Sequence, residues 1–233
     1  MIKKILKYTK NLILLCLGLV GIYLFNLFFM KPYSIDHFLG KELVLDLVDS
    51  PEAMTYIGVF DRFDWLTRHN SNLSIPKKDD RENSIKQYEQ VIRTLYKYDD
   101  SSLSQVQRNT KKIALFDAEN NLKQVKEFPH HDYPLNQIGG IHLNTIEFLS
   151  DMHPIRNESE AEDFIKRANL IKKVYEGVLA DLEDQADAGI FPPEFVYDHV
   201  IDQLSEFISY DYNEHPLYTQ FLRKVKELNV GQE

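Results

Sequence analysis

The sequence has only one cysteine among its 233 residues, and this residue, Cys16, lies in an apolar run near the N-terminus. A lone cysteine cannot form an intrachain disulfide, so we expect the fold to depend on the burial of apolar surface. A thiol nucleophile is excluded from the residues that follow the run, whereas catalysis by a serine or a carboxylate is not.

Acidic side chains are missing from residues 1–30, which contain Lys3, Lys4, Lys7 and Lys10. The rest of the chain therefore carries 23 of the 27 basic residues and all 36 acidic residues, a formal net charge of -13. A surface this negative repels phosphate backbones and anionic headgroups. We therefore expect no nucleic-acid partner.

Charge is also absent from residues 12–30, where Asn26 is the one strongly polar side chain. This run is long enough to cross a bilayer. A cleaved signal peptide is the competing interpretation, but the small residues typical of a cleavage site do not precede Met30. A lipoprotein site would need a small residue where Leu15 precedes Cys16. We predict an uncleaved anchor within a first region of residues 1–31.

The lysines that precede the run indicate its orientation, because positive charge stays on the cytoplasmic side. The N-terminus is then cytoplasmic, and the domain that follows faces the periplasm or cell exterior. The predicted location is the bacterial inner membrane, as a single-pass protein in contact with lipid through residues 12–30.

No stretch alternates between apolar and polar residues as a half-buried strand would, and apolar residues instead recur every three or four positions. We therefore predict an all-α fold, in which the transmembrane helix is followed by an antiparallel helical domain over residues 32–233. The polar residues 61–78 are predicted to form a long connection. The clearest helix covers residues 159–188, with a Ser159–Glu162 capping box at its start and Gly189 after its end.

The loop from Tyr133 to Gly140 is the predicted site of contact with a substrate. Prolines and paired glycines fix a turn or allow close approach of backbone, and amide side chains can hold an extended peptide. The alternative is structural, with the amides bonded to neighbouring helix ends. The candidate contact residues are Tyr133, Asn136, Gln137, Gly139 and Gly140.

Three other clusters are open to two interpretations each. His130, His131 and Asp132, with His142 and His153 beyond them, resemble a metal cluster, but intervening prolines and glycines favour capping or solvated roles. Four carboxylates between Asp181 and Asp187 lie on a predicted helix, which favours a solvated face over a calcium site. An aromatic pocket or simple packing at a helix turn would explain the cluster of Tyr210, Asp211, Tyr212, His215 and Tyr218.

Three segments carry a family resemblance: Phe128–Gly140, Ala188–Pro193 and Ser50–Gly58. They resemble domain-of-unknown-function family 885, a group of bacterial, metallopeptidase-like proteins. In that family a His-Glu-x-x-His zinc motif is expected in the C-terminal half. No histidine of this sequence precedes a glutamate, so we predict no catalytic residues and no metal ligands here.

The resemblance thus implies the N-terminal helical portion of a metallopeptidase-like protein that is truncated or split and inactive alone. Zinc would belong to the missing half, so the expected partners are a separate zinc-bearing chain and a peptide. The alternative is a membrane-tethered helical binding or adaptor protein that needs no metal.

Overall fold

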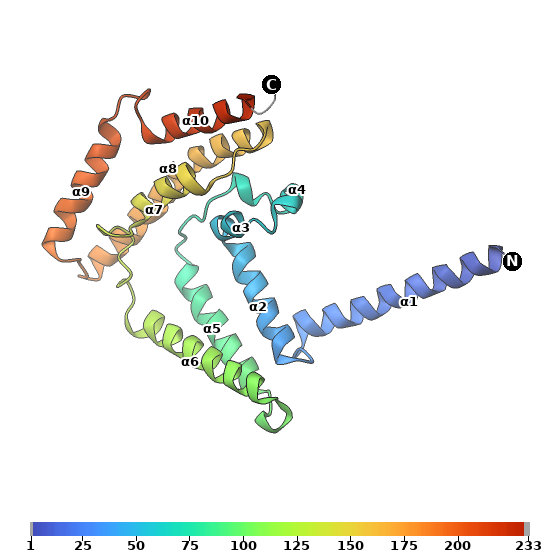
Figure 1. The fold of residues 1–233 in the computed structure, drawn as a ribbon. Helices are drawn as coiled ribbons and strands as arrows, with labels where there is room; N and C mark the ends of the chain where they lie inside the picture. The colour runs from blue at the N-terminus through green and yellow to red at the C-terminus, as the bar shows by residue number, and fades with distance from the viewer. Residues whose placement is uncertain (1, 231–233) are drawn as a thin grey trace. The chain divides into compact units, whose positions relative to one another are not determined.

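The computed structural model describes residues 2–230, and within this range the chain is helical and contains no strand. The predicted all-α class is confirmed. Residues 1 and 231–233, which the predicted regions include, lie outside the described range. Figure 1 shows the ten α-helices in chain order. They are α1 (Ile2–Phe29), α2 (Ile35–Asp49), α3 (Pro51–Ile57), α4 (Asp64–Thr67), α5 (Asp80–Tyr96), α6 (Gln105–Glu127), α7 (Ile141–Glu147), α8 (Glu158–Asp187), α9 (Glu194–Ser209) and α10 (Pro216–Val230).

Four single-turn helices lie between these elements. Three are 3-10 turns and one is a π-helical turn. They are η1 (Asp61–Phe63), η2 (His69–Ser71), η3 (Asp100–Ser102) and the π-helical η4 (Phe148–Met152).

Helix α1 contains the predicted anchor. Its segment Lys7–Phe29 is long and apolar enough to cross a membrane, and an N-terminal signal sequence would meet the same criteria. The 23 residues of this segment extend for about 34 Å, somewhat more than a hydrocarbon core. Asn26 is buried at the end of the helix, where its side chain donates to Lys31 O at 3.0 Å and accepts from Tyr33 N at 3.0 Å.

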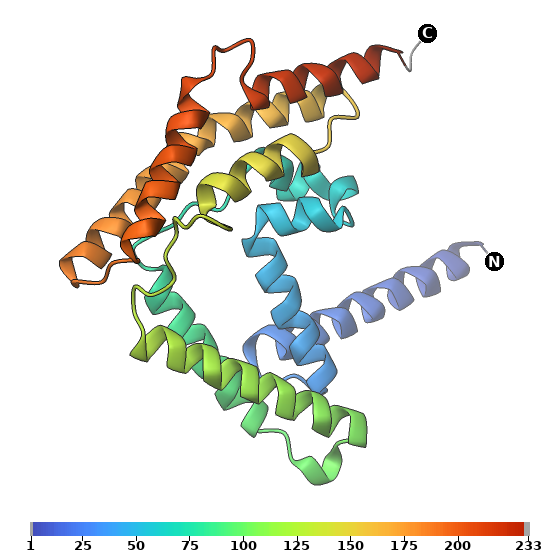
Figure 2. The same cartoon turned by 60° about the vertical axis from the view of Figure 1, so that its left-hand side comes forward.

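The chain forms two compact units, which we describe separately. The first contains the chain up to Leu45 together with Ser84–Lys123. Helices α5 and α6 lie side by side and antiparallel in it (Figures 1 and 2). Its core consists of Ile35, Phe38, Leu95, Tyr98 and Leu103.

The second unit contains Asp46–Asn83 and the chain from Gln124 onward. Helix α10 lies beside α8 in both views (Figures 1 and 2). One apolar cluster is centred on Leu73, Val174 and Val178, and a second on Leu149, Ile155 and Phe164. This unit contains every candidate site residue described below.

Several helix ends follow directly from the sequence. Ser50 accepts from Ala53 N as the N-cap of α3, with Pro51 in the first turn. Gly189 has a φ of 71° and donates its backbone N–H to Ala186 O, so it ends α8 as predicted. The start of α8 was predicted wrongly: the N-cap is Asn157, whose side chain accepts from Glu160 N at 3.0 Å.

The predicted connection over residues 61–78 is not a simple loop. Its first part contains η1, α4 and η2, and it buries His69 and Asn70 at 2% exposure each. Helix α6 continues through Asn120 and Asn121 without a break. The Asn120 side chain donates to Phe116 O, four residues earlier, which leaves the helical backbone intact.

Candidate binding groove

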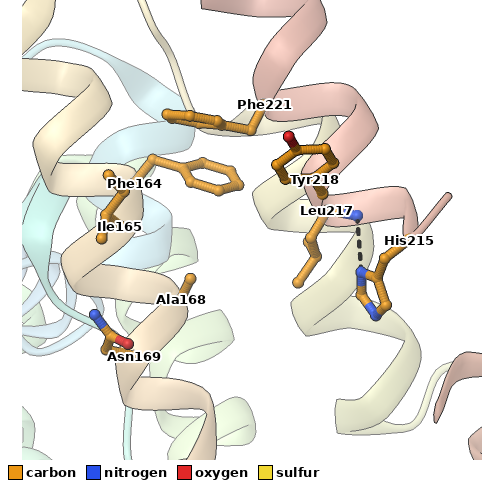
Figure 3. A pocket seen from close by; sticks show the side chains of 8 residues that line it. All are labelled: Phe164, Ile165, Ala168, Asn169, His215, Leu217, Tyr218 and Phe221. Atoms are coloured by element: carbon orange, nitrogen blue, oxygen red, sulfur yellow. Dashed lines mark hydrogen bonds between the residues drawn. The ribbon is translucent and has the colours of Figure 1, made fainter. Parts of the chain in front are cut away.

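An open groove of about 330 Å³ lies between α8 and α10 (Figure 3). Four of its lining residues come from α8, and four come from α10 and the turn before it. None of the eight is an acid, a lysine or an arginine. They are Phe164, Ile165, Ala168, Asn169, His215, Leu217, Tyr218 and Phe221.

Two tilted aromatic rings in contact form the groove's inner end. Phe164 is 5% exposed, and its ring centroid lies 5.1 Å from that of Phe221. The imidazole of His153 makes a T-shaped contact with the Phe164 ring, at a centroid distance of 5.4 Å. These rings belong to a cluster that also packs Leu217 and Val225 of α10. The groove therefore has a buried apolar base at Phe164, whereas Ile165 at its rim is 51% exposed.

His215 supplies the groove's one imidazole. Its Nδ1 accepts a hydrogen bond from Leu217 N at 3.3 Å, which caps the start of α10 (Figure 3). Burial lowers the pKa of His215, so the ring is neutral at pH 7. Phe207 contacts it edge-on at a centroid distance of 4.4 Å. The groove thus offers aromatic surface, one neutral imidazole and the Asn169 amide.

Only part of the predicted aromatic cluster lines the groove. His215 and Tyr218 line the groove, and Tyr212 contacts the Tyr218 ring at 5.8 Å. Tyr210 contacts His215 at 6.1 Å. The two interpretations of this cluster are therefore compatible, because some of its rings pack at the helix turn and others face the groove.

A buried arginine, Arg167, is bonded on the side of α8 that faces α3 and η2. Its side chain has no exposed surface. The guanidinium donates to Asn72 O at 2.7 Å, His69 O at 2.6 Å and Thr55 Oγ1 at 2.7 Å. It also lies over the Phe148 ring at 4.7 Å. These acceptors are uncharged, and the negative charges of Glu52, Asp64 and Asp163 also favour the cation.

Burial lowers the pKa of Arg167 to about 10, so the group still carries its charge at pH 7. Its Nη1 lies 2.8 Å from His153 Nδ1. Because a guanidinium can only donate, His153 accepts at Nδ1, and its Nε2–H donates to Glu160 O at 3.1 Å. Burial first, and then the charges of Arg167 and Lys224, lower the pKa of His153 to about 4.

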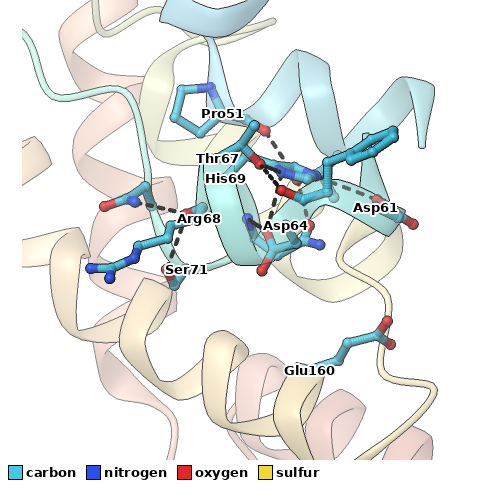
Figure 4. A network of polar contacts seen from close by, with 12 residues as sticks. Pro51, Asp61, Asp64, Thr67, Arg68, His69, Ser71 and Glu160 are labelled. Carbon is cyan, nitrogen blue, oxygen red and sulfur yellow. Dashed lines mark hydrogen bonds and ion pairs between the residues drawn. The ribbon is translucent and has the colours of Figure 1, made fainter. Parts of the chain in front are cut away.

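A second polar group surrounds His69 (Figure 4). Its Nδ1 lies 2.7 Å from Thr67 Oγ1 and 3.1 Å from Asp64 Oδ1, and its Nε2 lies 3.4 Å from Asp61 Oδ1. Arg156 binds the other oxygen of Asp61 at 2.5 Å. Burial alone would raise the pKa of Asp61, but Arg156 and His69 outweigh it and hold this pKa below its usual value. These contacts fix α4 against the second unit's core.

The predicted contact loop lies apart from the groove, since none of its five candidates lines it. Tyr133 has a φ of 38° and donates from its hydroxyl to Phe191 O at 3.5 Å. The Asn136 Oδ1 accepts from Ile138 N and Gly139 N at 3.1 and 2.9 Å. The Asn136 side chain therefore shapes its own turn.

Gln137 and Gly140 meet neighbouring elements through their backbones. Gln137 O accepts from Gln203 Nε2 at 3.2 Å, and the same Gln203 accepts from His142 Nε2 at 2.9 Å. A Cβ on Gly140 would lie 2.6 Å from Asn136 N, whereas one on Gly139 would meet nothing within 4 Å. Ile138 at the tip is 85% exposed.

The histidine-rich segment is dispersed. His131 is exposed and lies 2.8 Å from Pro129 O, whereas His142 and His153 are buried in separate hydrogen-bonded settings. Within the described residues, no three His, Cys, Asp or Glu side chains are grouped so as to hold a metal ion. This also applies to the carboxylates around Asp181, whose pKa is raised by burial and by Asp132 and Asp184.

The Arg167 network was not predicted from the sequence. The signal was present, because Arg167 lies three residues after Phe164 and seven before Val174, on the apolar stripe of α8. A charged residue in such a stripe must be bonded or must interrupt the packing.

The family model described as "Bacterial protein of unknown function (DUF885)" matches residues 51–233. No curated protein and no solved structure matches the chain.

Proposed function

Because the chain belongs to the DUF885 family of bacterial proteins, we propose that it is a membrane-anchored helical part of a metallopeptidase-like system. Its role is to hold an apolar side chain of a peptide in the groove between α8 and α10. The anchor is α1, uncleaved, with the helical region on the outer side of the bacterial inner membrane.

The observation that carries this proposal is the groove itself. Its eight lining residues are uncharged at neutral pH, its base is a pair of tilted aromatic rings in contact, and its rim is open. Grooves with such a lining bind apolar and aromatic side chains, and a few polar atoms orient the ligand. The Asn169 amide and the Tyr218 hydroxyl are the polar atoms suited to a peptide backbone.

The described residues do not fit a zinc ion, because they lack a grouped donor set and the sequence lacks a His-Glu pair. We therefore assign no catalytic step to this chain. In the proposed system zinc is held by a separate chain that corresponds to the family's metal-bearing part. The loop with Tyr133, Asn136, Gln137, Gly139 and Gly140 is proposed as a second peptide contact, through its exposed tip.

The proposal is tested by peptide binding to the full-length protein in nanodiscs. Two peptides are compared that differ only in a central phenylalanine or aspartate. Burial of one phenylalanine ring is worth about 1.5–3 kcal/mol, so we expect the phenylalanine peptide to bind at least about tenfold more tightly. Equal affinities, or preference for aspartate, would overturn the proposed groove function.

The alternative is a tethered binding or adaptor protein that works without a metal-bearing partner. It is favoured by the uncharged groove and by the lack of a grouped donor set among the described residues. The two candidates are separated by gentle purification from native membranes, with zinc content and peptide hydrolysis measured on the same sample. A zinc-loaded second chain with hydrolytic activity supports the metallopeptidase-like system. Peptide binding by a zinc-free sample supports the adaptor.

A further inference from the structure

Large apolar side chains are exposed on the surface of one short segment of the second unit, from the end of α3 through α4. Six of them occur within Tyr56–Leu66, and each is at least 46% exposed. We name this surface the α3–α4 patch. Its members are Tyr56 (72%), Ile57 (46%), Val59 (66%), Phe63 (52%), Trp65 (75%) and Leu66 (68%).

The acidic and basic side chains of this segment differ in exposure. Asp61 and Asp64 are half-buried, and their carboxylates bond to His69, to Asn70 N and to Arg156. Figure 4 shows both carboxylates beside the His69 ring. Arg62 and Arg68, by contrast, are exposed. The segment therefore exposes apolar and aromatic groups together with Arg62, and Arg68 is exposed just after it, in a chain whose net charge is negative.

The patch is also preformed. Gly58 ends α3 with a φ of 67°, and Asp64 fixes α4 to η2 through the bonds to Asn70 N and His69. Its exposed side chains thus project from a fixed backbone. Little conformational entropy is lost when such a surface inserts into another phase.

We infer that the α3–α4 patch inserts into the headgroup region of the same bilayer that α1 crosses. Tryptophan, tyrosine and arginine are the side chains that favour this region, where an apolar body and a polar tip are both accommodated. This inference rests on the proposed anchor, which fixes the occupant as a lipid surface. A covering protein is the competing occupant.

The length of the chain supports the lipid as occupant. Tyr56 follows the end of α1 by 27 residues, most of them in α2 and α3. At 1.5 Å per helical residue this stretch reaches about 50 Å at most. The anchor therefore keeps the patch at a high local concentration near the membrane surface. Because the whole chain is acidic, insertion should depend on apolar contact rather than on long-range attraction.

Trp65 is the only tryptophan of the chain, so its fluorescence reports on the patch directly. The full-length protein is reconstituted in phosphatidylcholine liposomes, with lipid brominated either near the headgroup or near the chain end. We expect short-wavelength emission that is quenched by about half by the shallow label and less by the deep one. Raising the salt should leave this quenching unchanged, since screening weakens only exposed charge interactions.

Two variants locate the effect. Phe63→Ser with Leu66→Ser changes exposed side chains, and we expect it to reduce quenching about twofold or more while the circular dichroism spectrum is unchanged. Ile208→Ser, at a residue that is 80% exposed on α9, is the matched control and should quench as the wild type does.

Alkaline extraction of the same liposomes tests the anchor separately. The inference is overturned if the protein resists extraction but Trp65 emits as it does in water and is not quenched by lipid. A protein partner would then be the occupant of the patch. If alkali releases the protein although Trp65 is quenched, insertion of the patch is supported and the transmembrane anchor is overturned.

Discussion

His153 Nδ1 accepts a hydrogen bond from Arg167 Nη1 at 2.8 Å, and this contact fixes both groups in one protonation state. The cation can only donate, so the histidine stays neutral. The same arginine binds Asn72 O and His69 O, and the same histidine contacts the groove's Phe164 ring. The pair thus joins the base of the groove to the segment between α3 and α5.

We predict that this pair makes stability depend on pH. The pKa of His153 is about 4 when folded, against an ordinary value of 6.5. Neutral His153 therefore contributes its full stabilisation above pH 6.5. As the pH falls toward 4, the free energy of unfolding decreases by about 3 kcal/mol in total. Urea unfolding of the full-length protein in detergent at several pH values within this window measures the loss.

His153→Gln should flatten that pH dependence, because an amide can accept from Arg167 and donate to Glu160 O without titrating. The lowered pKa of His215 contributes in the same direction, so some slope remains. His131→Gln, at an exposed site, is the control and should keep the wild-type slope. If His153→Gln has the slope of the wild type, the assignment of the titrating group is wrong.

We predict a large loss of stability for Arg167→Ala. The substitution leaves the carbonyls of His69 and Asn72 and the hydroxyl of Thr55 without their donor in a buried setting. The hydrogen bonds to the charged group are lost, and buried acceptors remain unsatisfied. Together these effects should lower the free energy of unfolding by about 3 kcal/mol or more. Lys172→Ala, on the same helix with 84% of its side chain exposed, should change stability by less than about 0.5 kcal/mol. Similar losses in both variants would refute the role of the buried network.

The adjacent glycines of the Tyr133–Gly140 loop should differ in their tolerance of alanine. Gly140→Ala places a methyl group 2.6 Å from Asn136 N and 2.7 Å from His142 Nδ1, so the turn must shift. We expect a loss of about 1–3 kcal/mol. Gly139→Ala, which meets open space, should be nearly neutral. Thermal unfolding of both variants checks this, and equal melting temperatures would argue against the close approach at Gly140.

Much of the fold follows from local patterns, and the exceptions have physical causes. The end of α8 at Gly189 and the start of α3 at Ser50 depend on neighbouring residues alone, so they were predictable. The start of α8 was misplaced because Asn157 and Ser159 are both capping residues, and the choice of Asn157 accompanies the contact of Glu160 with Arg156.

The candidate sites were less predictable because they depend on tertiary packing. The turns η1, α4 and η2 are too short to show a helical period, so their segment was interpreted as a loop. The groove joins residues of α8 to residues about fifty positions later, and His215 and Tyr218 were its only members considered as part of a pocket from the sequence. Pairing of helices at that separation is not a property of either helix alone.

If the groove between α8 and α10 receives a peptide side chain, a ring that fills the groove must weaken peptide binding. The affinity of the phenylalanine peptide is measured for full-length Ala168→Trp, which fills the groove, and for Lys172→Trp, which adds the same ring at an exposed position of α8. Both variants must first give wild-type circular dichroism, and Ile165→Asp replaces Ala168→Trp if that variant does not fold. We predict at least about tenfold weaker binding for the groove variant and wild-type affinity for the control. Unchanged affinity in the groove variant would show that the peptide side chain does not bind in this groove.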